Sequence, residues 1–279
     1  IGAIILAATF YFSTPMSVSE ALYKGIFHSI SAFCNAGFDI IGRDSLTPYR
    51  SNIIMNVILM VLIISGGLGF PVWIELIERQ KTKKSESIKK ARKLSLHIKV
   101  ALYVTGILIL AGMVLFLLLE WNNPHTLGQL SFGDKLLSAL FQSVTLRTAG
   151  FNTINQAELT DISQFFSCLF MLIGGSPAGT AGGIKTVTFS IIIISMVSIL
   201  KGIKQIEVFR RSLSLNLLQK VLTITMAMVT VVLFSTLLLH FTELNNSFSH
   251  TVIDLLFETS SAVGTVGITT GITPNLSAL

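Results

Sequence analysis

The sequence predicts an all-α membrane protein, in which repeated units of helix, half-length helix, loop and helix are arranged with pseudo-fourfold symmetry around a central pore. Two observations carry this prediction: a composition too apolar for a water-exposed surface, and a short loop motif that occurs three times in equivalent places. Of 279 residues, 51% are hydrophobic and 12% are charged. That charge content is about half the share in average soluble domains, so a lipid-facing surface is expected.

Four uncharged stretches are long enough to cross the hydrocarbon core of a bilayer, which requires about 20 apolar residues in a helix. They are Ser51–Ile74, Val100–Leu119, Ile162–Ile184 and Val221–Leu239, the third continuing past Lys185 into the apolar run Thr186–Leu200. The chain begins with Ile-Gly-Ala-Ile-Ile-Leu and has no basic segment before it. We interpret this start as the end of a helix that begins upstream, rather than as a signal peptide.

Basic residues are concentrated in two segments of the chain. Nine of the twenty Lys and Arg residues lie between Arg79 and Lys99, and five more lie between Lys201 and Lys220. By the positive-inside rule, both segments face the cytoplasm and the more acidic connections face outward. Nucleic acid is not an expected partner, because no aromatic or sequence pattern of nucleic-acid binding accompanies the charge. A role in topology or in docking a partner is expected instead.

Three apolar stretches are too short to cross a bilayer and are predicted to be re-entrant helices. They are Leu22–Phe33, Leu136–Leu146 and Val252–Val263. At about 1.5 Å per residue, each reaches only about halfway through the hydrocarbon core. Each is followed by Asn or Thr, a small or β-branched residue, Gly and a bulky apolar residue. The three glycines, Gly37, Gly150 and Gly267, are 113 and 117 residues apart, which indicates three copies of one unit.

These loops suit a cation pore. Irregular backbone at membrane depth must be buried in protein or line water, and carbonyl oxygens facing an axis can replace the hydration shell of a monovalent cation. Glycine permits the positive φ of such a turn, and the half-length helix points its negative C-terminal end toward the axis. For any single copy, a glycine that only ends a helix is an open alternative. The expected ion ligands are backbone carbonyls, with side chains of less importance, of Asn35, Ala36, Gly37, Thr148, Ala149, Gly150, Thr265, Val266 and Gly267.

A glycine-rich stretch interrupts the third long apolar region. We interpret it as a gate, because small residues can form a flexible loop that obstructs the pore below the filter, and discontinuous helices recur at transport sites. A packing kink is the alternative. A nucleotide-binding loop is not expected, because Ile184 precedes Lys185 where that motif requires Gly. The expected gate residues are Gly174, Gly175, Ser176, Gly179, Thr180, Gly182, Gly183 and Lys185.

Two charged residues and a second glycine-containing segment also have expected roles. Lys185 is either an electrostatic barrier or an anchor for the lower half-helix. Arg147 is expected to brace its loop against a carboxylate such as Glu258 or Asp254, since charges inside membranes are usually paired. The segment Ser65–Pro71 is expected to be a Pro-kinked helix with small-residue packing.

These segments resemble the pore regions of the Trk/Ktr/HKT family of potassium transporters. The resemblance rests on Phe27–Phe38, Arg147–Thr153, Gly174–Thr186 and Gly264–Ile268, which are similar to the second, third and fourth pore regions. It implies four M1–P–M2 units arranged as in potassium channels, with potassium or sodium as the substrate and no covalent cofactor. It also implies a homodimer in the lipid of the cell membrane, with filters facing outside, and a cytosolic nucleotide-binding regulatory ring docked on the basic segments.

The resemblance divides the chain into five parts. Residues 1–78 are the second unit, 79–96 a cytoplasmic basic loop, 97–200 the third unit with a broken M2, 201–213 another basic loop, and 214–279 the M1 and P of the fourth unit. The first unit and the last helix are expected to lie outside the chain. Because the first filter is not in view, the choice between potassium and sodium stays open.

Two other classes of function are weighed against a transporter. A membrane receptor or scaffold would use the half-length helices only for packing, and its stability would not depend on ions. An intramembrane enzyme is not expected, because the predicted spans contain no paired aspartates, no Ser–His couple and no His/Cys cluster.

Overall fold

The structure is a computed structural model that describes residues 1–42, 45–84, 94–202, 207–208, 211–212, 214–244 and 248–277. Much of both basic segments therefore lies outside the described residues. The helices are α1 (Gly2–Ser13), α2 (Val18–Phe33), α3 (Ile53–Leu68), α4 (Phe70–Lys84), α5 (Leu96–Glu120), α6 (Phe132–Thr145), α7 (Asp161–Met171), α8 (Thr186–Leu200), α9 (Leu215–Glu243) and α10 (Val252–Gly264). Single 3-10 turns occur at Thr47–Tyr49, Gln156–Glu158 and Thr273–Asn275.

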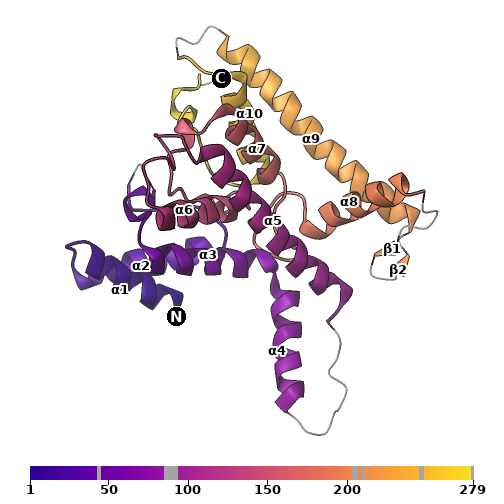
Figure 1. The fold of residues 1–279 in the computed structure, drawn as a ribbon, viewed down its shortest axis with the longest axis horizontal. Coiled ribbons are helices and arrows are strands. Elements are labelled where there is room, and N and C mark those ends of the chain that lie inside the picture. Colours follow the sequence, from indigo (N-terminus) through magenta and orange to yellow (C-terminus); the bar gives the residue numbers. More distant parts are fainter. Residues whose placement is uncertain are drawn as a thin grey trace.

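The predicted all-α architecture is confirmed for the described part of the chain, with one small exception. Strands β1 (Glu207–Val208) and β2 (Arg211–Ser212) form a short antiparallel pair between α8 and α9. Figure 1 shows this pair at one extremity of the molecule, away from the helices that meet in the centre.

Two helices of the described chain, α5 and α9, are each long and apolar enough to cross a membrane. Helices α3 and α4 qualify only if they count as one span, and they are bent by 97° at the break between them. Helix α4 projects away from the rest of the molecule (Figure 1). The bend occurs at Gly69, which has a φ of 82° and separates the two helices.

The three predicted re-entrant helices are α2, α6 and α10, and all three begin in the same way. A hydroxyl at the N-cap accepts a hydrogen bond from the backbone N–H three residues later, and that residue is acidic. The cap supplies a partner for an otherwise unpaired N–H, and the acid complements the positive end of the helix. The pairs are Ser17 with Glu20, Ser131 with Asp134, and Thr251 with Asp254.

Each re-entrant helix packs against two other helices. Helix α2 lies against α1 and α3, α6 against α5 and α3, and α10 against α9 and α7. Helix α2 can approach α1 closely at Gly25, because glycine has no side chain. A Cβ added there would lie only 2.5 Å from the backbone N of Ala7. One buried apolar cluster joins α1, α2 and α3 to α6, and a second joins α5, α6 and α7 to α10. The ends of the re-entrant helices are therefore held inside the protein.

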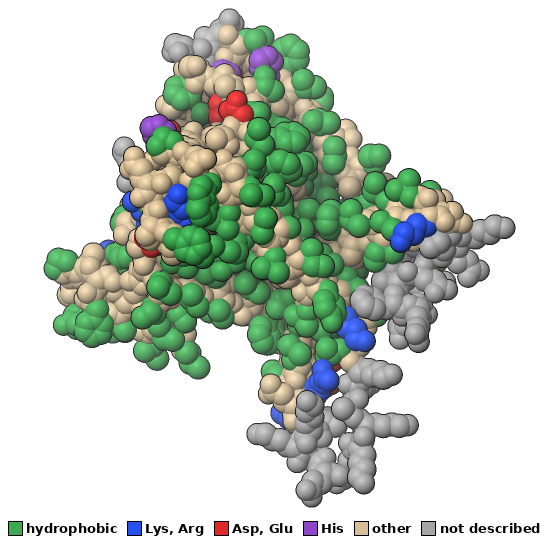
Figure 2. Space-filling model, viewed as in Figure 1, with side chains coloured by type: hydrophobic (Ala, Val, Ile, Leu, Met, Phe, Trp, Pro, Cys, Tyr) green, Lys and Arg blue, Asp and Glu red, His purple; other side chains and the backbone are tan. Residues whose placement is uncertain are grey.

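The outer face of the molecule is apolar, as a lipid-facing protein requires. Figure 2 shows hydrophobic side chains spread over the viewed face, with Lys and Arg side chains along α4 and near the end of α8. Large side chains such as Leu118 on α5 and Met226 on α9 are 74% and 67% exposed. Apolar exposure on this scale indicates contact with a membrane.

Candidate functional site

The chain adopts one backbone conformation after each of the three re-entrant helices. Asn35, Thr148 and Thr265 have φ values of 51°, 65° and 58°, and the glycines two positions later have 72°, 87° and 85°. Positive φ is uncommon for residues with a Cβ, so its recurrence at matching positions indicates one shared turn. We call these segments the three repeat loops: Asn35–Gly37, Thr148–Gly150 and Thr265–Gly267.

The three repeat loops meet at their glycines. A Cβ added at Gly37 would lie 2.7 Å from both the carbonyl O of Ala149 and the Cα of Gly150. One added at Gly150 would lie 2.6 Å from the Cα of Gly37 and 2.8 Å from the carbonyl O of Val266. One added at Gly267 would lie 3.9 Å from the Cα of Gly150. The second repeat loop therefore lies between the first and the third, and only glycine fits at the close contact.

A hydroxyl near the end of each re-entrant helix holds the residue after the glycine. In the first two copies it donates to a backbone carbonyl, and in the third it accepts from a backbone N–H. Equivalent hydrogen bonds thus fix each loop to its own helix. These hydroxyls were not among the residues predicted from the sequence. The bonds are Ser31 Oγ to Phe38 O (2.7 Å), Thr145 Oγ1 to Phe151 O (2.6 Å) and Ile268 N to Ser261 Oγ (3.0 Å).

The carbonyl oxygens of the repeat loops are available to a ligand. No described residue donates a hydrogen bond to any carbonyl of the nine predicted ligand residues. The backbone N–H groups of Ala36, Ala149 and Val266, in contrast, all donate back to the preceding helix. Asn35, Val266 and all of the second repeat loop are buried, whereas Ala36, Thr265 and Gly267 are exposed. Buried carbonyls are normally paired, so the unpaired ones at the buried residues need water or a ligand as a partner.

The glycine-rich loop, Gly174–Gly183, lies between α7 and α8 and is closed at its base. The backbone N–H of Gly174 donates to Ile184 O at 3.0 Å, and that of Ile184 donates to Leu172 O at 2.8 Å. Ile173 and Ile184 form an isolated parallel bridge. The loop therefore has a defined shape, and the helix is interrupted there rather than kinked.

The glycine-rich loop packs against the end of α3. Ser176 N donates to Gly67 O at 2.8 Å, and Thr180 N donates to Gly66 O at 3.1 Å. A Cβ added at Gly175 or Gly179 would lie 2.6 Å from Gly67 O. The small-residue packing predicted for Ser65–Pro71 is therefore present. The change of direction is larger than a proline kink, because the helix breaks at Gly69.

The glycine-rich loop also contacts the first and third repeat loops, and Arg147 beside the second. Thr180 Oγ1 donates to Asn35 Oδ1 at 2.6 Å in the first, and Gly174 O accepts from Arg147 Nη2, beside the second, at 3.0 Å. A Cβ added at Gly182 would lie 1.9 Å from Thr265 Oγ1 in the third. The loop is thus in position to respond to any change in these turns.

The predicted carboxylate partner of Arg147 is wrong. Glu258 accepts hydrogen bonds from Thr269, Thr270 and Thr273, and Asp254 caps its own helix. Arg147 is only 7% exposed and donates to a backbone carbonyl. It follows directly on the C-terminus of α6, where the helix dipole favours a positive charge. A helix end and a carbonyl therefore replace the expected carboxylate.

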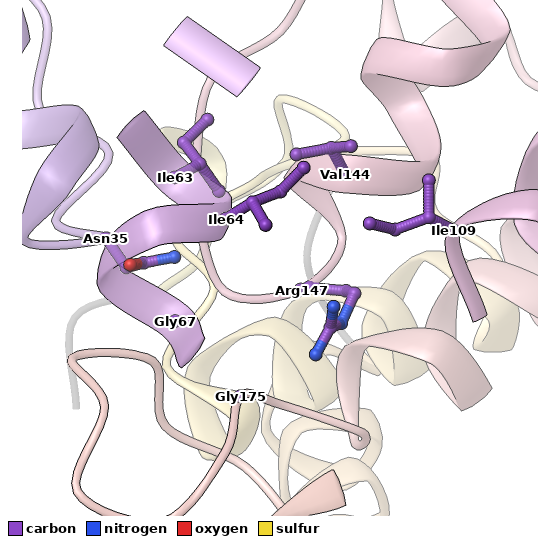
Figure 3. A pocket seen from close by; sticks show the side chains of 8 residues that line it. All are labelled: Asn35, Ile63, Ile64, Gly67, Ile109, Val144, Arg147 and Gly175. Atoms are coloured by element: carbon purple, nitrogen blue, oxygen red, sulfur yellow. The ribbon is translucent and has the colours of Figure 1, made fainter. Parts of the chain in front are cut away.

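A small cavity of about 10 Å³ lies between α3, α5, the end of α6 with Arg147, the first repeat loop and the glycine-rich loop. Figure 3 shows the side chains of Asn35 and Arg147 on its wall, with Ile64 and Ile109 among its apolar neighbours. Asn35 Nδ2 and Arg147 Nε are buried and have no hydrogen-bond partner among the described residues. The space suits about one water molecule.

Lys185 bonds within the glycine-rich loop. Its Nζ donates to Ala181 O at 2.7 Å. This contact agrees with the anchoring alternative for Lys185, and the electrostatic alternative stays a prediction.

The fold defines the class of this protein: a multi-pass membrane protein in which repeated re-entrant helices end at a common point. The family model of the cation transport protein TrkH matches residues 1–279. The chain belongs to this TrkH family of cation transport proteins, and the predicted family resemblance is confirmed. The family description is that of a transporter and not of an enzyme.

Relatives with curated names cover the whole chain. Potassium/sodium uptake protein NtpJ of Enterococcus hirae is 36% identical over 279 residues, which are 100% of this chain and 59% of the relative. Ktr system potassium uptake protein D of Bacillus subtilis is 38% identical over 280 residues, again 100% of this chain and 59% of the relative. The chain therefore spans less than two thirds of the length of these relatives.

A solved structure shares the fold. The crystal structure of the potassium transporter TrkH from Vibrio parahaemolyticus matches with a TM-score of 0.65 and 17% identity, covering 94% of this chain and 53% of that one. The predicted fold class is confirmed by this match.

Proposed function

We propose that the chain forms part of a transmembrane pathway for monovalent cations, with potassium as the main substrate. The carbonyls of the three repeat loops are the proposed ion ligands. The observation that carries the proposal is that the three loops meet at their glycines while their carbonyls accept no hydrogen bond from the described residues.

The chemistry of the repeat loops favours monovalent over divalent ions. The loops contain no Asp or Glu, whereas calcium and magnesium sites generally use carboxylates. Neutral carbonyl dipoles can replace the water around potassium at little cost. The C-terminal ends of α2, α6 and α10 precede the loops and add about half a negative charge each. Together these features supply a cation site without a fixed ionic ligand.

A sodium-permeable or mixed pathway is the second candidate. It is favoured by the name of the Enterococcus hirae relative, which includes both ions. Competition between the two ions in one assay separates the candidates.

The glycine-rich loop is the proposed gate. It interrupts a membrane helix, and it contacts the first and third repeat loops, Arg147 beside the second, and the end of α3. Hydrogen bonds to Gly66, Gly67, Phe33, Asn35 and Arg147 hold it in place, so its displacement must break these interactions. Deleting Ala178 and Gly179 from the full-length protein should increase cation flux, and unchanged flux would count against a gate.

We extend the proposal to the assembly and the orientation of the protein, on the basis of the family resemblance. The proposed protein is a homodimer in the cell membrane, with repeat loops toward the outside and the segments 79–96 and 201–213 in the cytoplasm, where a nucleotide-binding regulatory ring docks. The five-part division of the chain given above stays a prediction. Cross-linking of the full-length protein in membranes, with and without the regulator, tests the assembly.

Growth rescue tests the substrate. The full-length protein is expressed in bacteria that lack potassium uptake, and growth is measured at limiting potassium with increasing sodium. Rescue at limiting potassium is expected. Absence of rescue with verified membrane expression would overturn potassium as the substrate, and rescue abolished by sodium would favour the mixed pathway.

A further inference from the structure

The first repeat loop differs from the other two in how its side chain is held. Two positions before the glycine stand Asn35, Thr148 and Thr265, all with positive φ. Asn35 Oδ1 accepts a hydrogen bond from Thr180 of the glycine-rich loop at 2.6 Å. Thr148 is fully buried, and its hydroxyl has no partner within the described ranges. Thr265 Oγ1 lies close to Gly182, but within the described residues only the first loop is hydrogen-bonded through this side chain to the glycine-rich loop.

Thr180 is what fixes the Asn35 side chain. Asn35 is 7% exposed, and its Nδ2 has no hydrogen-bond partner in the part of the chain that the structure describes. The amide borders the small cavity shown in Figure 3, and among the described residues Thr180 alone forms a hydrogen bond with it. Loss of the Thr180 hydroxyl would leave a buried amide free to turn.

Thr180 is itself bound to the neighbouring backbone. Its single hydroxyl proton is shared between Asn35 Oδ1 at 2.6 Å and Phe33 O at 3.1 Å, and its N–H donates to Gly66 O at 3.1 Å. A Cβ added at Gly66 would lie 1.8 Å from Phe33 O, so α3 and the end of α2 are in direct contact here. Movement of the glycine-rich loop away from α3 must therefore separate Thr180 from Asn35.

We propose that Thr180 and Asn35 form a latch that makes ion selectivity depend on the position of the glycine-rich loop. With the loop seated, the latch holds the first repeat loop rigid and its carbonyls spaced for potassium. With the latch broken, the loop can contract around the smaller sodium ion. Thr180 is thus a positioning residue for the filter as well as part of the gate. This inference rests on the proposed function.

The test uses full-length protein in liposomes, with potassium and sodium fluxes measured under identical conditions. Thr180→Val keeps the shape of the side chain and removes the hydroxyl. It should lower the ratio of potassium to sodium flux about threefold to tenfold, the range for one buried hydrogen bond. Thr180→Ser restores the hydroxyl and should restore the ratio. Thr225→Val is the matched control, because Thr225 Oγ1 bonds Val221 O within α9 at 2.9 Å and lies in neither the glycine-rich loop nor a repeat loop.

A double-mutant cycle tests the pair itself. Asn35→Thr installs the residue found at the equivalent positions of the other two loops, so the turn should be tolerated. It should lower the flux ratio as Thr180→Val does, and the double variant should show no further change. Additive effects, or an equal change in Thr225→Val, would overturn the latch.

The two proposals fail in different ways. Wild-type liposomes that carry neither ion would overturn the proposed function, and the latch with it. Wild-type flux together with unchanged ratios in Thr180→Val and Asn35→Thr would overturn the latch alone.

Discussion

The backbones of Gly37 and Gly150 are in contact: a Cβ on Gly150 would lie 2.6 Å from the Cα of Gly37. The two glycines are far apart in the sequence and end two different re-entrant helices. Their contact shows that copies of the repeated motif come together at one point in the structure. At that place there is no room for a side chain.

The first prediction concerns this contact. Gly150→Ala should reduce potassium flux about tenfold or more, because positive φ costs an L-residue about 1–2 kcal/mol and the methyl group would also push the first loop away. Flux in liposomes measures it. Gly106→Ala on α5 is the control, since nothing lies within 4 Å of a Cβ there. Equal flux in both variants would contradict a filter at Gly150.

The positions of the re-entrant helices and their loops could be predicted from the sequence. Their apolar stretches are too short for a membrane, and glycine at a fixed place after each one indicates a turn with positive φ. Both signals are local. The hydroxyls of Ser31, Thr145 and Ser261 also carried a signal, because each lies near the end of its helix.

The partners of the glycine-rich loop could not be predicted in the same way. Thr180 bonds Asn35, which is 145 residues away in the sequence, and Arg147 bonds Gly174, which is 27 residues away. No spacing rule predicts either pair. A carboxylate seemed required for Arg147 because charges are usually paired. The interruption of a helix supplied a free carbonyl instead, which only the three-dimensional structure reveals.

The second prediction concerns Arg147. Arg147→Met removes the bond to Gly174 O and should release the glycine-rich loop, raising potassium flux about tenfold, since a charged hydrogen bond contributes about 1.5–3 kcal/mol. Flux is compared in liposomes without the regulator. Arg50→Met is the control, because Arg50 is exposed. A fall in flux would assign Arg147 to the filter and not to holding the gate.

The third prediction concerns the hydroxyl that holds the second repeat loop. Thr145→Val leaves the buried Phe151 carbonyl unpaired, at a cost of about 1–3 kcal/mol. The Tm should fall by several degrees, and Thr145→Ser should restore it. Thr225→Val is the control, because Thr225 bonds only within its own helix, to Val221 O at 2.9 Å. An unchanged Tm in Thr145→Val would show that the hydroxyl does not hold the loop.

The fourth prediction concerns Glu120, the last residue of α5, which holds together the loops after α5 and before α7. Its carboxylate is fully buried and accepts bonds from Asn123, Thr126 and both the N–H and the hydroxyl of Thr160. Glu120→Gln replaces one acceptor oxygen by an N–H₂ group, which then faces donors. Each unmet donor costs about 1–3 kcal/mol, so the Tm should fall by several degrees.

Potassium selectivity should be unaffected by Glu120→Gln, because the carboxylate contacts no repeat loop. Glu158→Gln is the matched control: its carboxylate is 47% exposed and only 4.0 Å from His125 Nδ1, so its Tm should be unchanged. Equal thermal unfolding of the two variants would mean that water replaces the protein donors around Glu120. A change in the ratio of potassium to sodium flux would mean that the outer connections reach the repeat loops after all.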